Sequence, residues 1–323
     1  MKIVVTDCKT VTQGDLDLTI LQQYGEVSLF PATSYAELPE RIADADIVLT
    51  NKSLLDANVL SKAPNVKYIG LFATGYNNVD IDYCTDHGIW VCNAGSYSTN
   101  AVAQHTFALI LNHYSQIANY NQFVAADGWK QSDTFSPFIF PTAELTGRTI
   151  GLIGYGSIAK AVAKIALAFN MNVLVYTRTP RPDALLDASH FVSLDTLLAS
   201  SDIVSVHCPL NKDSQHLFCA TTFEKMKHGA FFVNTARGGV LVEEDLKNAL
   251  LSGHLSGAAI DVLETEPMSS DCVLHQIPNL TTTPHVAWAP METRQRLLSI
   301  VCKNIEGFLQ KNPSNLVNPN VLK

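Results

Sequence analysis

The chain has 323 residues, 47% of them hydrophobic, and a formal net charge of −8 at pH 7. This length predicts about two domains, and the hydrophobic content excludes an intrinsically disordered chain. Because the charge is negative and basic residues form no run, neither nucleic acid nor a membrane surface is an expected partner. No apolar run reaches the roughly 18 residues that a membrane span needs.

The seven cysteines are odd in number, scattered, and never in CxxC spacing. That pattern favours reduced thiols over a disulfide framework or a zinc site, so we expect a cytoplasmic protein and no metal. Cys208 is most simply a small buried hydrophobic residue.

The first 100 residues alternate between short apolar runs and helical patterns. We expect strands near residues 3–5, 47–49, 68–72 and 90–91, and helical segments near 14–24, 35–43 and 56–63. Such alternation predicts a parallel sheet with helices on both faces. A longer apolar helix is expected over 98–113, and residues 120–146 then lose periodicity while carrying several aromatic rings and two prolines.

Residues 149–159, TIGLIGYGSIA, predict a buried strand, a glycine turn and the start of a helix. Gly154 permits the tight turn, Gly156 lets a phosphate approach the backbone, and Ala159 lets helix and strand pack closely. The N–H groups and dipole of the helix start favour a pyrophosphate. Glycine turns of this kind also occur in α/β folds that bind no nucleotide, so the motif alone leaves both interpretations open.

A second alternating series follows, with strands expected at 173–176, 203–207, 230–234, 257–261 and 280–283 and a final helix at 292–309. This rhythm fits a six-stranded dinucleotide-binding sheet. Arg237, Glu266 and His285 follow or end successive strands, where ligands bind in open α/β sheets. Arginine can clamp a carboxylate, histidine can act as general acid or base, and glutamate can orient it. Each also has a plain alternative, as a surface ion pair, a structural histidine or a loop residue.

Seven stretches of the chain match, in the same order, the motifs of one known enzyme family. The chain resembles the D-isomer-specific 2-hydroxyacid dehydrogenase family over essentially its whole length, and within it glycerate dehydrogenases (hydroxypyruvate reductases). The matching stretches are ATGYNNVD (73–80), VAQHTFA (102–108), GLIGYG (151–156), HCPL (207–210), NTARGG (234–239), AIDV (259–262) and TPHVAWA (283–289).

The resemblance implies a division of labour. Arg237 binds the substrate carboxylate and polarises the 2-oxo group, and His285, held in its protonated form by Glu266, gives a proton to the carbonyl oxygen. A nicotinamide delivers hydride to C2 and forms the D-hydroxy acid. Backbone N–H groups of Thr74 and Gly75 help to bind the carboxylate. Lys52, at the end of another strand, either reaches the substrate or is a solvated surface lysine.

The same resemblance implies an α/β architecture of two doubly wound parallel-sheet domains. A Rossmann-type cofactor domain, residues 99–287, interrupts a flavodoxin-like substrate domain, residues 1–98 and 288–323, with the active site in the cleft between them. The protein is then a homodimer, in which a dimerisation segment at about 120–146 reaches the partner and Phe138 enters the partner's substrate pocket.

The implied cofactor is NAD(P), leaning toward NADP. Relatives that prefer NAD usually carry an acid after the second strand, whereas this chain has Thr177 and then Arg178, which could pair with a 2′-phosphate. The absence of an acid in some NAD-dependent relatives leaves the choice open. The implied cofactor contacts are Gly154, Gly156, Ser157, Ile158, Thr177, Arg178, His207, Cys208, Pro209, Thr235, Ala236, Asp261 (to the nicotinamide amide) and Thr106.

The sequence therefore predicts an oxidoreductase that reduces a small 2-oxo acid, hydroxypyruvate or glyoxylate. Trp288, three residues past His285, either caps the substrate and excludes bulky 2-oxo acids or is a core aromatic residue before the final helix. Two alternatives remain: a D-lactate-type dehydrogenase of the same family, and a nicotinamide-sensing binding protein of the corepressor type, which would bind cofactor without turnover.

Overall fold

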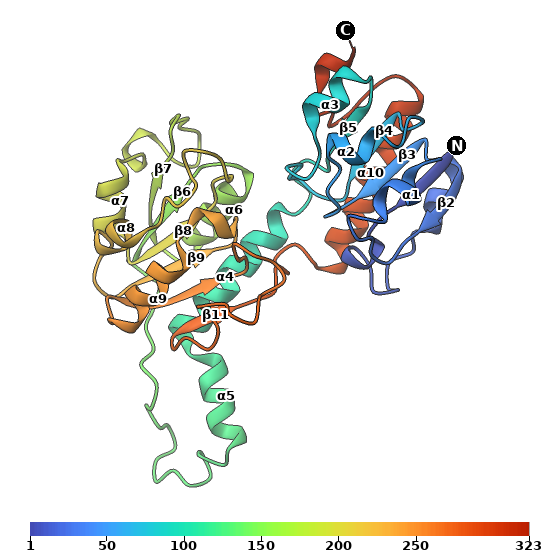
Figure 1. Ribbon diagram of the computed structural model, residues 1–323. Helices are drawn as coiled ribbons and strands as arrows, with labels where there is room; N and C mark the ends of the chain where they lie inside the picture. Colours follow the sequence, from blue (N-terminus) through green and yellow to red (C-terminus); the bar gives the residue numbers. More distant parts are fainter. Residues whose placement is uncertain (323) are drawn as a thin grey trace. The chain divides into compact units, whose positions relative to one another are not determined.

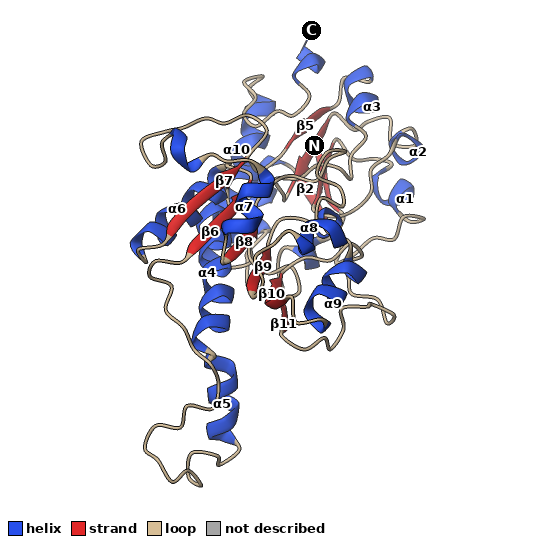
Figure 2. Ribbon diagram, turned by 90° about the vertical axis from the view of Figure 1, so that its left-hand side faces the viewer, coloured by secondary structure: helices blue, strands red, loops and turns tan. Residues whose placement is uncertain are grey.

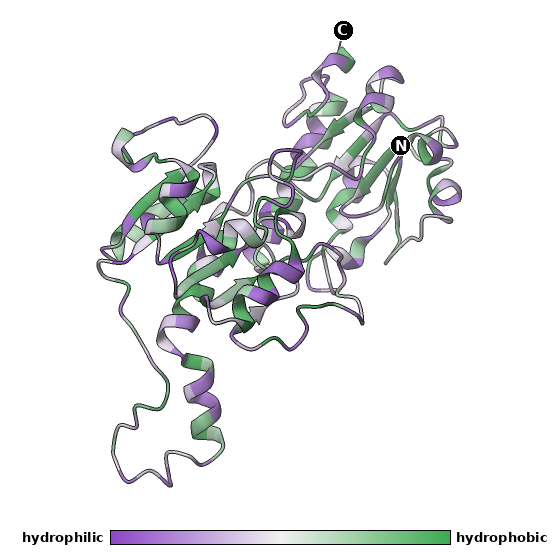
Figure 3. Ribbon diagram, turned by 60° about the vertical axis from the view of Figure 1, so that its left-hand side comes forward, coloured by the Kyte–Doolittle hydropathy of each residue, from purple (hydrophilic) through white to green (hydrophobic). Residues whose placement is uncertain are grey.

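The structure is a computed structural model that describes residues 1–322, and its helices and strands are coloured in Figure 2. It divides into two compact units (Figure 1). Unit 1 contains residues 1–98 and the segment from Ala289 onward, whereas unit 2 is the continuous stretch Thr99–Trp288. Each unit is built on one parallel sheet, and the strands of both sheets are predominantly hydrophobic (Figure 3). The predicted α/β class with two parallel sheets is confirmed.

Unit 1 contains a five-stranded sheet within residues 1–322, in the order β2-β1-β3-β4-β5. This is the flavodoxin-like order, with one switch point beside the first strand. Buried apolar runs form its central strands, because both faces are covered by helices. The strands are β1 (Lys2–Val5), β2 (Glu26–Leu29), β3 (Ile47–Thr50), β4 (Tyr68–Leu71) and β5 (Trp90–Cys92), and the helices are α1 (Leu38–Ile42), α2 (Ala57–Leu60), α3 (Ile81–Asp86) and α10 (Met291–Leu309).

The early helices of unit 1 are shorter than the sequence predicts. The expected helix over 14–24 is reduced to a 3-10 turn at Thr19–Tyr24, and Gly14 and Gly25, both at positive φ, lie on either side of it. In the expected segment 35–43 the helix covers only Leu38–Ile42, with Pro39 in its first turn. Such short helices are held by packing and caps, since an isolated turn is not stable by itself. The Asp56 carboxylate, for example, accepts the Val59 N–H at the start of α2.

The segment after α10 closes the edge of the unit 1 sheet. Leu316 pairs with Cys92 of β5, and the Val317 N–H donates to the Val91 carbonyl. Asn318 is buried there: its Oδ1 accepts the Val91 N–H at 3.0 Å and its Nδ2 donates to the Ile89 carbonyl at 2.9 Å. One amide side chain thus satisfies two buried backbone groups at the end of this sheet.

Unit 2 contains a six-stranded parallel sheet within the described residues, in the order β11-β10-β9-β8-β6-β7. An isolated parallel bridge between Val175 and Phe191 extends it beyond β7, so that the chain order matches a dinucleotide-binding sheet with a vestigial third strand. The strands are β6 (Thr149–Ile153), β7 (Asn172–Tyr176), β8 (Ile203–Val206), β9 (Ala230–Asn234), β10 (Leu255–Ile260) and β11 (Leu280–Thr282). The helices are α4 (Thr99–Ser115), α5 (Ile117–Ala125), α6 (Ser157–Ala168), α7 (Leu194–Ser200), α8 (Ala220–Glu224) and α9 (Glu243–Leu251).

The segment that follows α4 projects from unit 2 as an arm (Figure 1). The sequence predicts no periodicity from residue 120 onward, but α5 continues to Ala125 before the chain becomes irregular. On the arm Phe135 is 91% and Phe138 92% exposed. Across residues 1–322, none of the helices combines the length and apolar character needed to cross a membrane.

Asn318→Ala is expected to lower the free energy of unfolding by about 1–3 kcal/mol, because it leaves the Val91 N–H and the Ile89 carbonyl buried without their partner. Urea denaturation measures the loss. The control is Asn320→Ala, which changes an exposed amide two residues away. Equal stability of the two variants would contradict a role for Asn318 in closing the sheet.

Candidate active site

The turn from β6 into α6 has the geometry of a phosphate cradle. Gly154 adopts φ = +94°, and a Cβ there would lie 3.1 Å from the His207 carbonyl oxygen, so glycine is what fits beside this neighbouring loop. Gly156 is the N-cap residue of α6 and supplies no side-chain cap, and the position that a Cβ would occupy there is open space. The first N–H groups of a twelve-residue helix therefore face an uncrowded turn, which fits the pyrophosphate of a dinucleotide.

The residues after β8 are held neutral by burial. Burial lowers the pKa of His207 to about 4, so this ring is uncharged at neutral pH, and its Nε2 is 2.9 Å from the Ser205 hydroxyl. Burial also raises the pKa of the Cys208 thiol, which leaves it protonated and poorly nucleophilic. This edge can therefore pack against a neutral group such as a nicotinamide or ribose ring without a competing charge.

The end of β7 carries an ion pair that the sequence did not reveal. Arg178 pairs with the carboxylate of Asp213, and both side chains are 65% exposed. The sequence has no acid after this strand, but the fold brings one from a loop beyond β8, 35 residues away. No local pattern could have identified Asp213, because the pairing depends on which loops meet at the sheet edge.

The turn that carries Arg237 is held by its own strand. Asn234, fully buried at the end of β9, donates from Nδ2 to the Arg237 carbonyl at 2.9 Å and accepts the Ala236 N–H at 3.0 Å. At Gly238 a Cβ would lie 1.9 Å from the Leu263 carbonyl carbon, so only glycine lets this turn meet the next loop. The Arg237 turn therefore contacts the loop that leads to Glu266.

Glu266 and His285 form the central pair of the site. The Glu266 Oε2 atom is 2.7 Å from the His285 Nδ1, and the Glu266 Oε1 accepts the Leu263 N–H at 3.0 Å. Because a carboxylate only accepts, His285 Nδ1 is assigned as the protonated nitrogen, and Nε2 is the atom that would exchange a proton with a substrate. His285 adopts φ = +54°, a left-handed conformation that is costly outside glycine.

Asp261 has a structural task that the sequence did not predict. Its carboxyl group is 1% exposed, and it accepts the Thr283 hydroxyl at 2.6 Å and the backbone N–H groups of Val286 and Ala287 at 2.9 Å each. It therefore holds the loop on which His285 lies. Its expected contact with a nicotinamide amide stays a prediction.

The structure brings Arg237, Glu266 and His285 to adjoining loops at the carboxyl ends of β9, β10 and β11 in unit 2. The predicted cofactor contacts at 154, 156–158, 177–178, 207–209, 235–236, 261 and 106 also belong to unit 2. Among them Thr106 and Thr235 are linked by their hydroxyl groups at 3.1 Å. Their roles toward a cofactor stay predictions.

The predicted substrate contacts are distributed differently. Thr74, Gly75 and Lys52 belong to unit 1, where the Thr74 hydroxyl donates to the Gly95 carbonyl and the Lys52 N–H donates to the buried Asp7 carboxylate at 2.6 Å. Trp288 is the last residue of unit 2 and lies three residues before the start of α10, and Phe138 lies on the arm. Their substrate roles stay predictions, as does the assignment of the two units as substrate and cofactor domains.

Sequence reasoning missed Asn234, Asp7 and Asp213. The first two could have been found, because each is a polar residue that ends or follows a buried strand, a position where side chains commonly turn back onto the next loop. Within residues 1–322, no group of three or more histidine, cysteine or acidic side chains is arranged to hold a metal ion.

The geometry defines an α/β dehydrogenase site, with a dinucleotide turn on one sheet and an acid–base pair at the carboxyl ends of its strands. Residues 107–287 match the family "D-isomer specific 2-hydroxyacid dehydrogenase, NAD binding domain". The chain belongs to the D-isomer-specific 2-hydroxyacid dehydrogenase family, and its cofactor is a nicotinamide dinucleotide. The predicted family and the predicted oxidoreductase class are thereby confirmed.

Individual relatives agree with this family. The chain is 40% identical to a hydroxypyruvate reductase of Blautia hydrogenotrophica over 98% of its own length and 100% of the relative's. Among solved structures it resembles the TT0316 protein of Thermus thermophilus, with a TM-score of 0.88, 33% identity and coverage of 98% and 100% of the two chains. It also resembles a D-lactate dehydrogenase of Aquifex aeolicus solved with NAD and lactic acid, with a TM-score of 0.85, 28% identity and coverage of 98% and 99%.

Glu266→Gln tests the pairing with His285. A neutral amide stabilises imidazolium less than a carboxylate does, so the pH at which kcat/KM for 2-oxo acid reduction falls should move to a lower value. The oxidation limb should move in the same direction. The measurement is the pH profile of both directions, with Glu264→Gln as a control on the same loop; an unmoved profile in Glu266→Gln would contradict the pairing.

Proposed function

We propose that the protein reduces a small 2-oxo acid, hydroxypyruvate or glyoxylate, to the corresponding D-2-hydroxy acid. The observation that carries this proposal is the 2.7 Å contact between Glu266 and His285, since reduction of a ketone requires a positioned proton donor. The 40% sequence identity with the Blautia hydroxypyruvate reductase, over 98% of this chain and 100% of that one, supports the choice of substrate. We assign the reaction to the cytoplasm, because the seven cysteines are free thiols.

Each residue of the central group has a separate task in this reaction. Arg237 binds the substrate carboxylate through its guanidinium fork, a contact that is strong when both charges are desolvated. His285 Nε2 donates the proton to the carbonyl oxygen, while Glu266 on Nδ1 keeps the ring oriented and compensates its positive charge. In the oxidation direction the same nitrogen accepts the hydroxyl proton.

The nicotinamide, when bound, supplies the hydride that the 2-oxo carbon accepts. The turn at Gly154 and Gly156 would hold its pyrophosphate at the start of α6, and the loop at 207–209 would lie along the neutral part of the molecule. Thr177 and Arg178, at the end of β7, would lie near the adenosine ribose.

We infer a preference for NADPH from Arg178, and its pairing with Asp213 sets how strong that preference is. Exposed ion pairs contribute only about 0.2–1 kcal/mol, so a doubly charged 2′-phosphate can replace the Asp213 carboxylate as the partner of the guanidinium. The same carboxylate would, however, repel the phosphate. The preference is therefore modest and depends on both residues.

A panel of 2-oxo acids measured with wild type and Arg237→Ala tests the substrate proposal. Hydroxypyruvate and glyoxylate should be reduced more efficiently than pyruvate, 4-methyl-2-oxopentanoate and phenylpyruvate, and Trp288→Ala should narrow the gap if the indole limits substrate size. Arg237→Ala should lose at least about 100-fold in kcat/KM, and Arg237→Lys should not restore it because lysine lacks the bidentate fork.

Pyruvate as the preferred substrate would indicate the D-lactate-type alternative. Cofactor binding without turnover of any 2-oxo acid would overturn the enzymatic proposal. If Arg237→Ala keeps nearly wild-type kinetics, Arg237 is not the residue that binds the substrate carboxylate.

The cofactor preference is tested by two substitutions with opposite expected effects. Arg178→Ala should lower the ratio of kcat/KM for NADPH to that for NADH, because it removes the phosphate partner. Asp213→Asn should raise the same ratio, because it removes the competing charge. Initial-rate kinetics with both cofactors give the ratios. If either variant changes kcat/KM for NADPH and for NADH by the same factor, the assignment of Arg178 to the 2′-phosphate is refuted.

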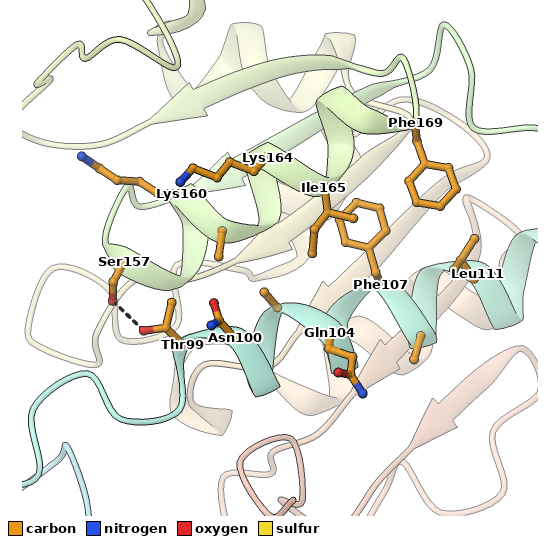
Figure 4. Close-up of a pocket in the computed structure, with 13 residues that line it drawn as sticks. Thr99, Asn100, Gln104, Phe107, Leu111, Ser157, Lys160, Lys164, Ile165 and Phe169 are labelled. Carbon is orange, nitrogen blue, oxygen red and sulfur yellow. Dashed lines mark hydrogen bonds between the residues drawn. The ribbon is translucent and has the colours of Figure 1, made fainter. Parts of the chain in front are cut away.

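We propose that two copies of the chain associate through the arm. On unit 2 the helices α4 and α6 leave a groove of about 810 Å³, and Figure 4 shows the rings of Phe107 and Phe169 beside Ile165 and Leu111 along it. The rings of Phe135 and Phe138 are almost fully exposed on the same unit. The exposed rings and the apolar end of this groove favour burial against a second copy of the chain.

Light scattering should give 70.4 kDa at micromolar concentration, which is twice the 35.2 kDa of one chain. A variant with Phe135→Ser and Phe138→Ser should shift toward the monomer mass, because it removes the two exposed apolar rings that association would bury. Leu251→Ser, an exposed apolar residue on α9, is the matched control. A monomeric wild type would refute the dimer.

A further inference from the structure

Two consecutive residues of α4 each contact one of the two functional turns of unit 2. The Thr106 hydroxyl lies 3.1 Å from the Thr235 hydroxyl, in the turn that leads to Arg237. The His105 Nε2 lies 3.0 Å from the hydroxyl of Thr283, in the turn that leads to His285. The helix therefore fixes both turns from behind the sheet edge, and His105 has no part in the chemistry described above.

The direction of the hydrogen bonds at Thr283 follows from counting protons. The hydroxyl has one hydrogen, which it donates to the Asp261 Oδ1 at 2.6 Å, because an ionised carboxylate can only accept. The same hydroxyl must then accept a hydrogen bond from His105, so His105 Nε2 carries the hydrogen. The result is a directed chain from His105 through Thr283 to Asp261, with His105 Nε2 itself 3.6 Å from Asp261 Oδ1.

Asp261 transmits this chain to the backbone around His285. Its carboxylate accepts the N–H groups of Val286 and Ala287, and its main-chain carbonyl accepts the His285 N–H at 2.8 Å. Because a buried carboxylate is costly unless its oxygens are satisfied, each donor around it restrains its position. Those donors therefore restrain the backbone next to His285, which adopts a left-handed conformation and contacts Glu266 through its ring.

We propose that His105 and Thr283 are positioning residues for the acid–base histidine: their hydrogen-bonded chain fixes the Asp261 carboxylate and, through it, the 283–287 loop. The proposal rests on the proposed function, since it assigns these residues to the proton transfer of His285. It gives Asp261 a task toward the loop that is separate from any contact with the nicotinamide.

The test uses substitutions that preserve shape and remove one hydrogen bond at a time. Thr283→Val keeps the β-branched volume without the hydroxyl, and Thr283→Ser keeps the hydroxyl. His105→Leu removes the donor, whereas His105→Gln retains an N–H at a similar reach. Thr282→Val is the matched control, because it makes the same change at the neighbouring exposed residue.

With hydroxypyruvate as substrate, Thr283→Val should lower kcat by about 10- to 100-fold, the size expected for losing a hydrogen bond to a charged group. His105→Leu should lower kcat by about 2- to 10-fold, because the hydrogen bond that it removes joins a neutral hydroxyl. The dissociation constant for the reduced cofactor should change less than about twofold. The solvent deuterium isotope effect on kcat should rise, because proton transfer from a misplaced donor becomes slower. Thr283→Ser and His105→Gln should recover most of the loss.

A measurement without turnover separates this proposal from the proposed function. The His285 ring signal in a ¹H–¹³C spectrum, assigned by its loss in His285→Asn, should shift in Thr283→Val and His105→Leu and stay in place in Thr282→Val. If wild type turns over no 2-oxo acid, the proposed function fails, while an altered ring signal still supports the positioning role.

Three results would overturn the proposal. One is an unshifted His285 signal in both Thr283→Val and His105→Leu. Another is wild-type kcat in these variants. The third is a loss confined to cofactor binding, which would assign the chain of hydrogen bonds to the cofactor instead of the histidine.

Discussion

The candidate site depends on a polar side chain at the end of each of two adjacent buried strands that turns back to hold the turn that follows. Asn234 does this for the turn with Arg237, and Asp261 does it for the loop with His285. Both are almost completely buried, so their hydrogen bonds form where water does not compete. Neutral Asn234 satisfies one donor and one acceptor, whereas charged Asp261 collects only donors, and three of them come from the loop itself.

Close backbone contact links these two turns. At Gly238 the backbone meets the Leu263 carbonyl so closely that no side chain could be accommodated, and the Leu263 N–H in turn holds one oxygen of Glu266. The turn that carries Arg237 and the loop that carries Glu266 are therefore positioned by one shared contact. Their relative placement does not rely on long side chains, which would cost conformational entropy to order.

The sequence predicted the central strands of both sheets, because buried parallel strands are continuous apolar runs that stand out from their surroundings. It missed β2, a short edge strand whose residues are mostly exposed. It predicted the roles of Arg237, Glu266 and His285 from family motifs. The structure places Glu266 and His285 in contact, and the roles themselves stay predictions. Short helices such as Leu38–Ile42 were predicted too long, since their ends are set by packing and not by periodicity. Asp213 was out of reach, because its partner Arg178 is distant in sequence and neither residue belongs to a repeating pattern.

The discontinuity of unit 1 also has a consequence during synthesis. Residues 1–98 emerge first, but α10 packs on their sheet, with Phe308 5.0 Å from the Tyr68 ring and 5.4 Å from that of Trp90. At translation rates of 5–20 residues per second, residues 289–323 follow the end of unit 2 by roughly 2–7 s. Throughout that interval unit 2 is a complete continuous segment, whereas the first sheet still lacks the helix that covers its aromatic face. The nascent chain therefore leaves an apolar face of the first sheet uncovered until α10 has been synthesised.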